Sequence, residues 1–378
     1  MEQIPFNTLA PQHDASVNDA LLSVVRDDWF ILGNRLQAFE SAYADLSGVK
    51  YCVGTGNGHD ALVLALKSLG LGGSSQGRSA DEVLVSANTC TATWLAISNA
   101  GCIPVPVEPD PHTMNIDVSR ILGSITPNTR AIMPVHLYGN PCDMGTIVSL
   151  ARKYSLRVVE DNAQAHGATF TIADSQQEQL TGSFGDANAT SFYPTKNLGA
   201  LGDGGAVTTN DDVVANRVRV LRNYGYTSKD VCEVVGINSR LDEIQAAILS
   251  VKLKRLLEWN EERRRIAEMY RQLLLGCGDL VLPAATEGGK HVYHLYVIQT
   301  SHREALQRHL RSRGIQTMIH YPVPPHLQQA YEGLGYRRGS FPITERLSDQ
   351  VISLPLWIGM SDDQVVRVAE EVRRYFGD

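Results

Sequence analysis

The alternation of β-branched runs with helical stretches over residues 50–210 constrains the fold of this chain most strongly. Short runs rich in Val and Ile predict strands at Val83–Ser86, Ile103–Val107, Ala131–His136 and Val158–Glu160. Apolar residues recur at helical spacing in Ala61–Leu69, Thr146–Lys153 and Val213–Arg222. Strands that alternate with helices in this way are typical of a largely parallel sheet wrapped by helices. We therefore predict an α/β fold for this segment.

The sequence changes character near Arg240. Residues 242–275 contain neither Pro nor Gly and are rich in Ala, Leu, Glu and Arg, which predicts one or two long helices. Beyond Gly276 the pattern predicts a strand, a helix, a second strand and a last amphipathic helix, at Val292–Gln299, Arg303–Arg313, Ile315–Ile319 and Asp362–Tyr375. We expect a large domain over residues 1–250 and a smaller α+β domain over residues 251–378. Two polar stretches, 72–77 and 174–181, predict surface loops.

Composition and charge exclude several classes of function. The 378 residues carry a formal net charge of -7, and the densest basic run, residues 263–265, directly follows two glutamates, so nucleic acid is not an expected partner. The first residues lack a basic start followed by an apolar core, and no apolar stretch has the length of a membrane span. Six scattered cysteines show no metal-ligand spacing. We expect a cytoplasmic protein with reduced thiols and no membrane partner.

A glycine-rich turn, residues 54–58 (GTGNG), opens a predicted helix. Free backbone N–H groups and the positive end of the helix dipole at such a turn suit a phosphate ester. A dinucleotide fingerprint fits less well, because His59 occupies its third glycine position. The turn alone is a weak signal.

Two further residues carry possible chemistry. Asp161 ends a predicted strand, so its carboxylate should lie at the carboxyl edge of the sheet, where it could keep a pyridine nitrogen protonated. Gln164 follows three residues later and could bond a ring hydroxyl. Lys196 lies in a turn-rich segment, and its amine could form an imine and carry a proton. By residue type alone, Asp161 is as readily a helix N-cap and Lys196 a solvated surface charge.

These segments belong to a set of ordered motifs. The set comprises residues 160–167 (EDNAQAHG), 191–206 (SFYPTKNLGALGDGGA), 29–33 (WFILG), 56–62 (GNGHDAL), 135–139 (VHLYG), 238–242 (NSRLD) and 320–322 (HYP). Together they closely resemble the DegT/DnrJ/StrS family of sugar aminotransferases, over nearly the whole chain. The resemblance implies a fold-type I enzyme with a mostly parallel seven-stranded sheet between helices, a smaller C-terminal α+β domain, and pyridoxal 5'-phosphate held at the interface of a homodimer.

The resemblance also implies roles for single residues. Lys196 matches the lysine that forms the imine, Asp161 the partner of the pyridine nitrogen, and Gln164 the neighbour of the ring hydroxyl. Phosphate contacts are implied for the turn residues Gly58 and His59, for Ser191, and for Asn238 reaching over from the second subunit. Trp29, Tyr193 and His320 are implied to lie near the substrate.

Two positions depart from the family pattern. Cys90 stands where the family usually has an aromatic residue that stacks on the cofactor ring, so stacking must be weaker or supplied by another residue. His59 stands where a small or aliphatic residue is more usual. A packed thiol is the commoner alternative to a nucleophilic Cys90. The spacing of His320 and His326 across three prolines fits no common metal-ligand pattern, and no metal is expected.

The resemblance implies a reaction in two halves. L-glutamate gives its amino group to the cofactor, leaving pyridoxamine 5'-phosphate, which then aminates a nucleotide-linked keto sugar. The tract around Lys196 and the 320–322 motif look most like enzymes acting at C3 of 3-keto-6-deoxy sugars, with dTDP as the expected nucleotide. A C4-specific aminotransferase and a sugar dehydratase of the same family are the alternatives, and Lys196 speaks against the dehydratase, which has histidine there. An oxidoreductase would need the dinucleotide fingerprint, and a sensor would need a DNA-binding region.

Overall fold

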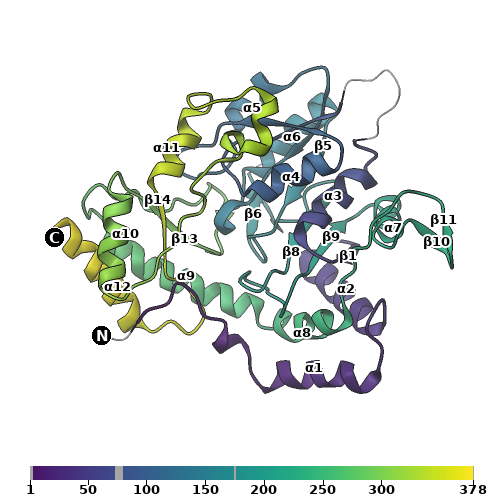
Figure 1. Cartoon of the computed structure of the whole chain (residues 1–378), viewed down its shortest axis with the longest axis horizontal. Helices are drawn as coiled ribbons and strands as arrows, with labels where there is room; N and C mark the ends of the chain where they lie inside the picture. The colour runs from purple at the N-terminus through teal and green to yellow at the C-terminus, as the bar shows by residue number, and fades with distance from the viewer. Residues whose placement is uncertain (1–2, 73–79, 174–175, 378) are drawn as a thin grey trace.

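A seven-stranded sheet forms the centre of the computed structural model, which describes residues 3–72, 80–173 and 176–377 (Figure 1). The strand order is β1-β9-β8-β5-β4-β2-β3. The strands are β1 (Tyr51–Thr55), β2 (Glu82–Ser86), β3 (Ile103–Val107), β4 (Thr129–Met133), β5 (Arg157–Asp161), β8 (Ala187–Ser191) and β9 (Gly205–Thr209). Strand β9 is antiparallel to both of its neighbours, β1 and β8, and all other adjacent strands of this sheet are parallel. The predicted mostly parallel sheet is confirmed.

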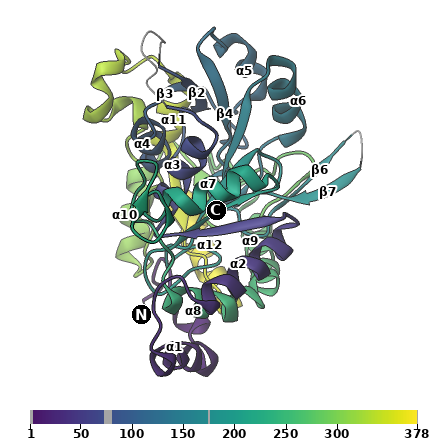
Figure 2. The same ribbon diagram turned by 90° about the vertical axis from the view of Figure 1, so that its right-hand side faces the viewer.

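Both faces of the sheet are buried, as the continuous apolar runs in its strands require. Side chains alternate between the faces, so Val83 and Val85 of β2 belong to one core while Leu84 belongs to another. The first core is covered by helices α3 (Gly58–Ser68), α4 (Thr91–Asn99) and α7 (Asp212–Leu221). The opposite face is covered by α5 (Val118–Ser124) and α6 (Met144–Tyr154) beside β2–β5, and by α2 (Asn34–Ser47) and α8 (Glu243–Leu253) beside β1 and β9. Figure 2 shows β4 between these two layers of helices.

Helix α8 contacts both amino-terminal helices, α1 (Ala15–Asp27) and α2. Helix α1 packs along α8, as Figure 1 shows at the bottom of the view. The carboxylate of Glu243, in the first turn of α8, accepts hydrogen bonds from the backbone nitrogens of Gly33, Arg35 and Leu36, at 2.8, 2.9 and 3.0 Å. These N–H groups begin α2 and have no partner within their own helix, so Glu243 caps it from another helix.

A second hydrophobic core lies beyond α8. It is built from α9 (Leu256–Leu274), α10 (Arg303–Ser312), β13 (Tyr296–Gln299), β14 (Val351–Leu354) and α12 (Asp362–Phe376). Ile4 is buried in the same core and pairs with Ile315, which brings the start of the described chain beside α10 and α12 (Figure 1). Helix α11 (Pro342–Gln350) packs nearer the main sheet. The division of the chain at residue 250 stays a prediction.

Several predicted elements differ from the observed ones. The strand predicted over Ile315–Ile319 is wrong, because Ile315 pairs with Ile4 and Met318 with Ser353, and this change of partner prevents a continuous ladder. The strand predicted from Val292 begins at Tyr296, and the one predicted to reach His136 ends at Met133. The loop predicted at 174–181 contains β7 (Gln177–Leu180), which pairs with β6 (Thr169–Ile172). The loop predicted at 72–77 lies, beyond Gly72, outside the described residues.

Two small sheets project from this frame. Strand β12 (Gly289–Lys290) pairs with β6 on the side away from β7. Strand β10 (Tyr226–Ser228) forms a hairpin with β11 (Val231–Cys232), and this hairpin extends beyond α7 at the edge of Figure 1. No helix in the described part of the chain is both long and apolar enough to cross a bilayer.

Candidate active site

Residues that follow five parallel strands meet at the carboxyl edge of the sheet. They line one cavity of about 110 Å³. Seven residues singled out from the sequence line it together: Gly58, His59, Cys90, Asp161, Gln164, Ser191 and Lys196. Crevices at this edge are where open α/β sheets bind ligands. A larger hollow of about 730 Å³ lies elsewhere, between α6 and the β6–β7 hairpin, and contains none of these residues.

Asp161 is the last residue of β5 and points to the face that α3 and α4 cover. Its Oδ2 accepts a hydrogen bond of 2.8 Å from Thr93 Oγ1 on α4, and its Oδ1 accepts one of 3.1 Å from the Ala163 nitrogen. Burial raises the pKa of the Asp161 carboxyl, while these two bonds and the nearby Lys196 lower it. The side chain is therefore held rigidly in a dry place where a cationic partner is favoured.

Lys196 lies in the loop after β8. Its backbone nitrogen donates to the Tyr193 carbonyl at 2.9 Å, and burial lowers the pKa of its amine, opposed by Cys90 and Asp161. Gly199 closes this loop on Pro194, where an added Cβ would lie 2.2 Å from the Pro194 oxygen. A lowered pKa favours the uncharged amine, which is the nucleophilic form.

Buried side chains from α8 and α9 hold the same loop from behind. Lys252 Nζ donates to the Gly199 carbonyl at 2.9 Å, and Asn197 Nδ2 donates to Asn260 Oδ1 at 2.9 Å and to the Val292 carbonyl at 3.1 Å. The position of Lys196 is thus set by elements far apart in the sequence.

The first turn of α3 forms a cradle for an anion. Asn57 caps the helix by accepting from the Asp60 nitrogen at 2.8 Å, whereas the N–H groups of Gly58 and His59 have no acceptor inside the helix. An added Cβ on Gly58 would lie 2.5 Å from the Ser191 Cβ, so glycine permits the close approach of Ser191 to the helix start. Two N–H groups, a hydroxyl and the helix dipole suit a phosphate.

Gln164 is fixed by two partners. Its Oε1 accepts from the Tyr138 nitrogen at 2.6 Å, and its Nε2 donates to Tyr321 Oη at 3.0 Å. Burial raises the pKa of the Tyr321 phenol, and the neighbouring Cys90 thiol raises it further, so the hydroxyl keeps its proton. The second N–H of the Gln164 amide remains free to donate to a ligand, and the predicted contact with a ring hydroxyl stays a prediction.

Cys90 and His59 both line the cavity. Cys90 is the N-cap residue of α4. The His59 ring nitrogens lie 3.3 Å from Asp60 Oδ1 and 3.0 Å from Asn99 Nδ2. Tyr321 is another ring in the lining, and it comes from the C-terminal part of the chain.

Four predicted residues do not line this cavity. Trp29 and Tyr193 are 63% and 53% exposed, and Asn238 is exposed beside the turn, where its neighbour Ser239 accepts from the Gly56 nitrogen at 2.9 Å. His320 Nδ1 lies 2.8 Å from Ser353 Oγ, and burial together with Lys196 lowers the pKa of His320 to about 4. The predicted roles of these four residues stay predictions.

Thr93, Tyr138 and Tyr321 were not singled out from the sequence. Tyr138 and Tyr321 fall inside motifs quoted for the resemblance, which is a signal that could have found them. Thr93 lies three residues after Cys90 on the first turn of α4, and only the packing of α4 against β5 reveals its bond to Asp161. In the described part of the chain, no three His, Cys, Asp or Glu side chains gather as metal ligands would.

These residues fit a phosphorylated pyridine cofactor. The cradle at Gly58, which a Cβ would fill, suits the phosphate, the buried Asp161 suits the ring nitrogen, and the Lys196 amine suits the aldehyde. A mostly parallel sheet with this trio at its carboxyl edge defines the class of pyridoxal phosphate enzymes with the fold-type I architecture.

Comparisons with known proteins narrow the class. Residues 11–373 match the DegT/DnrJ/EryC1/StrS aminotransferase family, and the chain belongs to it. It is 47% identical, over 98% of its length and 99% of the relative, to the dTDP-3-amino-3,6-dideoxy-alpha-D-galactopyranose transaminase of Aneurinibacillus thermoaerophilus. It is 42% identical, over 96% and 95%, to the UDP-N-acetyl-3-dehydro-alpha-D-glucosamine 3-aminotransferase of Acidithiobacillus ferrooxidans.

A solved structure shares the whole fold. The DesV structure of S. venezuelae, in complex with a ketimine intermediate, superposes with a TM-score of 0.94 at 41% identity and covers 100% of both chains. The chain is a pyridoxal phosphate-dependent aminotransferase, as the sequence predicts.

Proposed function

We propose that the enzyme moves the amino group of L-glutamate to C3 of a nucleotide-linked 3-keto-6-deoxy sugar, with dTDP as the nucleotide. One observation carries the choice of C3. The names of the two relatives cited above specify sugars linked to different nucleotides, dTDP and UDP, yet both names place the amino group at C3. The higher identity to the dTDP-sugar enzyme supports that nucleotide.

When bound, pyridoxal 5'-phosphate supplies an aldehyde that links to amines and a ring that accepts the electron pair left when the adjoining carbon loses its proton. Lys196 Nζ would hold the cofactor at its aldehyde. Its lowered pKa would also let Nζ accept a proton and return it at the reacting carbon. The Asp161 carboxylate keeps a proton at the ring nitrogen, and Thr93 orients that carboxylate.

The remaining cavity residues orient the group. Ser191 and the first turn of α3, at Gly58 and His59, bind the phosphate, and Gln164 binds the ring hydroxyl. Tyr193, Trp29 and His320 border the sugar site. His320 is uncharged near neutral pH because burial lowers its pKa to about 4, so it offers the sugar a neutral imidazole.

The working unit in this proposal is a homodimer whose subunits share their active sites. Exposed Trp29, Phe30 and Ile31, together with the projecting β10–β11 hairpin, supply an apolar surface for a second copy. Exposed Asn238 reaches the partner's phosphate site. Six free thiols agree with a cytoplasmic location.

A mixing experiment tests the shared sites. Lys196→Ala and Asn238→Ala are each expected to be inactive or weak alone. A co-expressed mixture should regain activity, because one site of the mixed dimer then has both native residues. A monomer in light scattering, or a mixture no better than its parts, would refute the shared site.

The reaction itself is tested with purified holoenzyme, L-glutamate and a panel of dTDP- and UDP-linked 3-keto and 4-keto sugars. Mass spectrometry and NMR of the products locate the new amine. We expect turnover with 3-keto sugars and none with Lys196→Ala. Amination of 4-keto sugars alone would move the assignment to C4, and loss of water without gain of an amine would indicate a dehydratase.

A further inference from the structure

The two acidic residues at the end of β5 point to opposite faces of the sheet. Asp161 faces the cofactor cavity and α4, whereas Glu160 lies on the side that α6 covers and is fully buried. None of the roles proposed above uses Glu160. A fully buried carboxylate is costly unless each oxygen has donors, so its partners are informative.

Glu160 has four donors. Its Oε1 accepts from the backbone nitrogens of Phe184 and Gly185 at 2.7 and 2.8 Å, and its Oε2 accepts from that of Gly182 at 2.8 Å. The fourth donor is His136 Nε2, 2.8 Å from Oε2. The carboxylate therefore ties the turn before β8 to the segment after β4.

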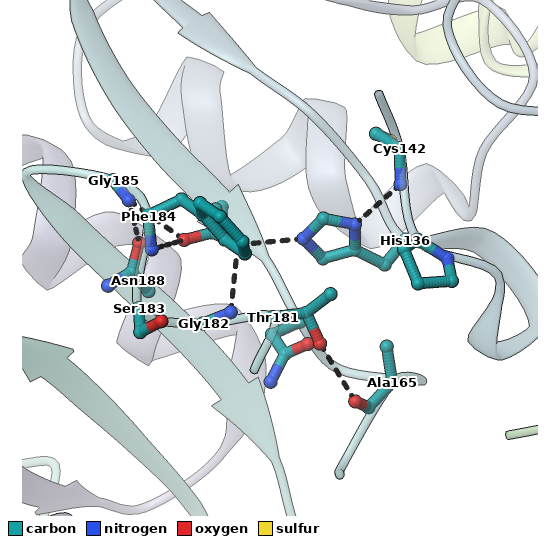
Figure 3. Close-up of polar contacts among 12 residues, drawn as sticks. His136, Cys142, Ala165, Thr181, Gly182, Ser183, Phe184, Gly185 and Asn188 are labelled. Atoms are coloured by element: carbon teal, nitrogen blue, oxygen red, sulfur yellow. Dashed lines mark hydrogen bonds and ion pairs between the residues drawn. The ribbon is translucent and has the colours of Figure 1, made fainter. Parts of the chain in front are cut away.

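The hydrogen bonds fix the tautomer of His136. Its Nδ1 accepts from the Cys142 backbone nitrogen at 3.0 Å, so the proton of the neutral ring lies on Nε2 and points to Glu160. Figure 3 shows the His136 ring between Cys142 and the turn Gly182–Gly185. The ring is fully buried.

The segment that carries His136 touches two cofactor-facing residues. The His136 nitrogen donates to the Asp161 carbonyl at 3.1 Å, and the Asp161 nitrogen donates to the Pro134 carbonyl at 2.8 Å. Two residues further on, the Tyr138 nitrogen donates to Gln164 Oε1 at 2.6 Å. Displacement of His136 would therefore move the supports of both Asp161 and Gln164.

We propose that His136 and Glu160 are positioning residues for the cofactor site, which hold Asp161 and Gln164 in register from the opposite face of the sheet. This inference rests on the proposed roles of those two residues. His136 and Glu160 touch neither cofactor nor substrate; they act through the backbone of residues 134–138 and 161. Asp161 needs such support because a small misplacement of a group that holds a ring weakens binding and catalysis together.

The competing explanation is that the pair only stabilises the fold. The chain offers a matched pair for comparison: His326 Nε2 lies 3.1 Å from Glu345 Oε1, and both side chains are buried. That pair supports the 3-10 turn at 325–327 and the start of α11, away from the cavity. Loss of either histidine should lower the melting temperature, but only loss of His136 should change the cofactor.

The experiment compares His136→Leu, His136→Gln and His326→Leu. Each variant is titrated with pyridoxal 5'-phosphate to obtain its affinity, its visible absorbance band is followed against pH, and the cofactor-free protein is melted. His136→Leu is expected to lose affinity by about tenfold or more, as for one lost charge-assisted hydrogen bond, and to shift the pH midpoint of the band. His136→Gln has an amide with both a donor and an acceptor, so it should restore most of the cofactor affinity and most of the wild-type pH midpoint.

His326→Leu should keep the wild-type affinity and pH midpoint despite a lower melting temperature. Wild-type affinity and midpoint in His136→Leu, or an equal loss of affinity in His326→Leu, would overturn the inference. If His136→Leu does not fold, Glu160→Gln, which keeps the shape of the side chain, decides by the same two readouts.

Asp161→Ala distinguishes a wrong role for Asp161 from a wrong role for His136. If it keeps the wild-type affinity and midpoint, the proposed role of Asp161 fails and the inference falls with it. If Asp161→Ala changes both readouts while His136→Leu changes neither, only the inference is wrong. Neither outcome depends on which sugar the enzyme uses.

Discussion

Replacement of Thr93 by valine should move the acid side of the activity profile. The Thr93 hydroxyl donates to Asp161 Oδ2 at 2.8 Å in a buried place, and this bond lowers the pKa of a carboxyl that burial raises. Valine keeps the shape of the side chain and removes the donor. A charge-assisted bond of this kind contributes about 1.5–3 kcal/mol, and its loss should raise the pKa of Asp161 further.

The measurement is kcat against pH for the holoenzyme. Activity needs the ionised carboxylate, so the acid limb should move to higher pH. The free energy of unfolding of the cofactor-free protein should also depend on pH. Because the folded pKa of Asp161 is raised, its favourable contribution is complete below the unfolded pKa and is lost as pH rises through the folded pKa. The loss of unfolding free energy in Thr93→Val relative to wild type should therefore grow with rising pH.

Thr209→Val is the control, because the buried Thr209 Oγ1 donates at 2.7 Å to a neutral acceptor, the Asp186 carbonyl, away from the cavity. It should cost about 0.5–1.5 kcal/mol of unfolding free energy and leave the acid limb in place. An unmoved limb in Thr93→Val, with unchanged cofactor affinity, would refute the role given to this bond.

Three shorter predictions follow from the same cavity. Lys196→Ala should bind the cofactor without the visible band that L-glutamate bleaches, and a normal band in this variant would contradict the covalent role of Lys196. Gly58→Ala places a Cβ 2.5 Å from the Ser191 Cβ, which should cost about 1–3 kcal/mol in melting experiments and weaken phosphate binding. Cys90→Phe should slow the loss of pyridoxamine 5'-phosphate on dialysis, since a ring adds a stacking face; faster loss would show that the cavity cannot accept it.

The sequence predicted best those site residues that lie in local motifs. Asp161 ends a strand and Lys196 follows one. Parallel strands bring such positions to one edge, so their meeting with Gly58 could be expected. The bond from Thr93 to Asp161 could not, because it depends on the rotation of α4 about its axis, which apolar spacing leaves open over a turn. The contact of Tyr321 with Gln164 joins residues 157 positions apart and has no local signal.

The C-terminal fold was harder to predict for a related reason. An apolar run such as Ile315–Ile319 favours a strand, but a strand needs one continuous partner, and here Ile4 and Ser353 divide the run between them. His136 and Glu160 are a similar case. Sequence alone makes each a polar residue at the end of a predicted strand, and only the tertiary fold reveals that they face each other in the interior.

The pairing of Ile4 with Ile315 also bears on the order in which the molecule is made. The Phe6 nitrogen bonds Gln316 Oε1 across 310 positions, next to the backbone bonds from Ile4 to Gly314 and from Gln316 to Ile4. Residues 4–6 emerge from the ribosome long before residues 314–316 have been synthesised. Ile4 and Phe6 therefore cannot form these bonds, and the Ile4 side chain cannot enter the second core, until residues 314–316 have been synthesised. Completion of the second core is thus a late event in biosynthesis, whereas the strands around Asp161 and Lys196 have all emerged well before it.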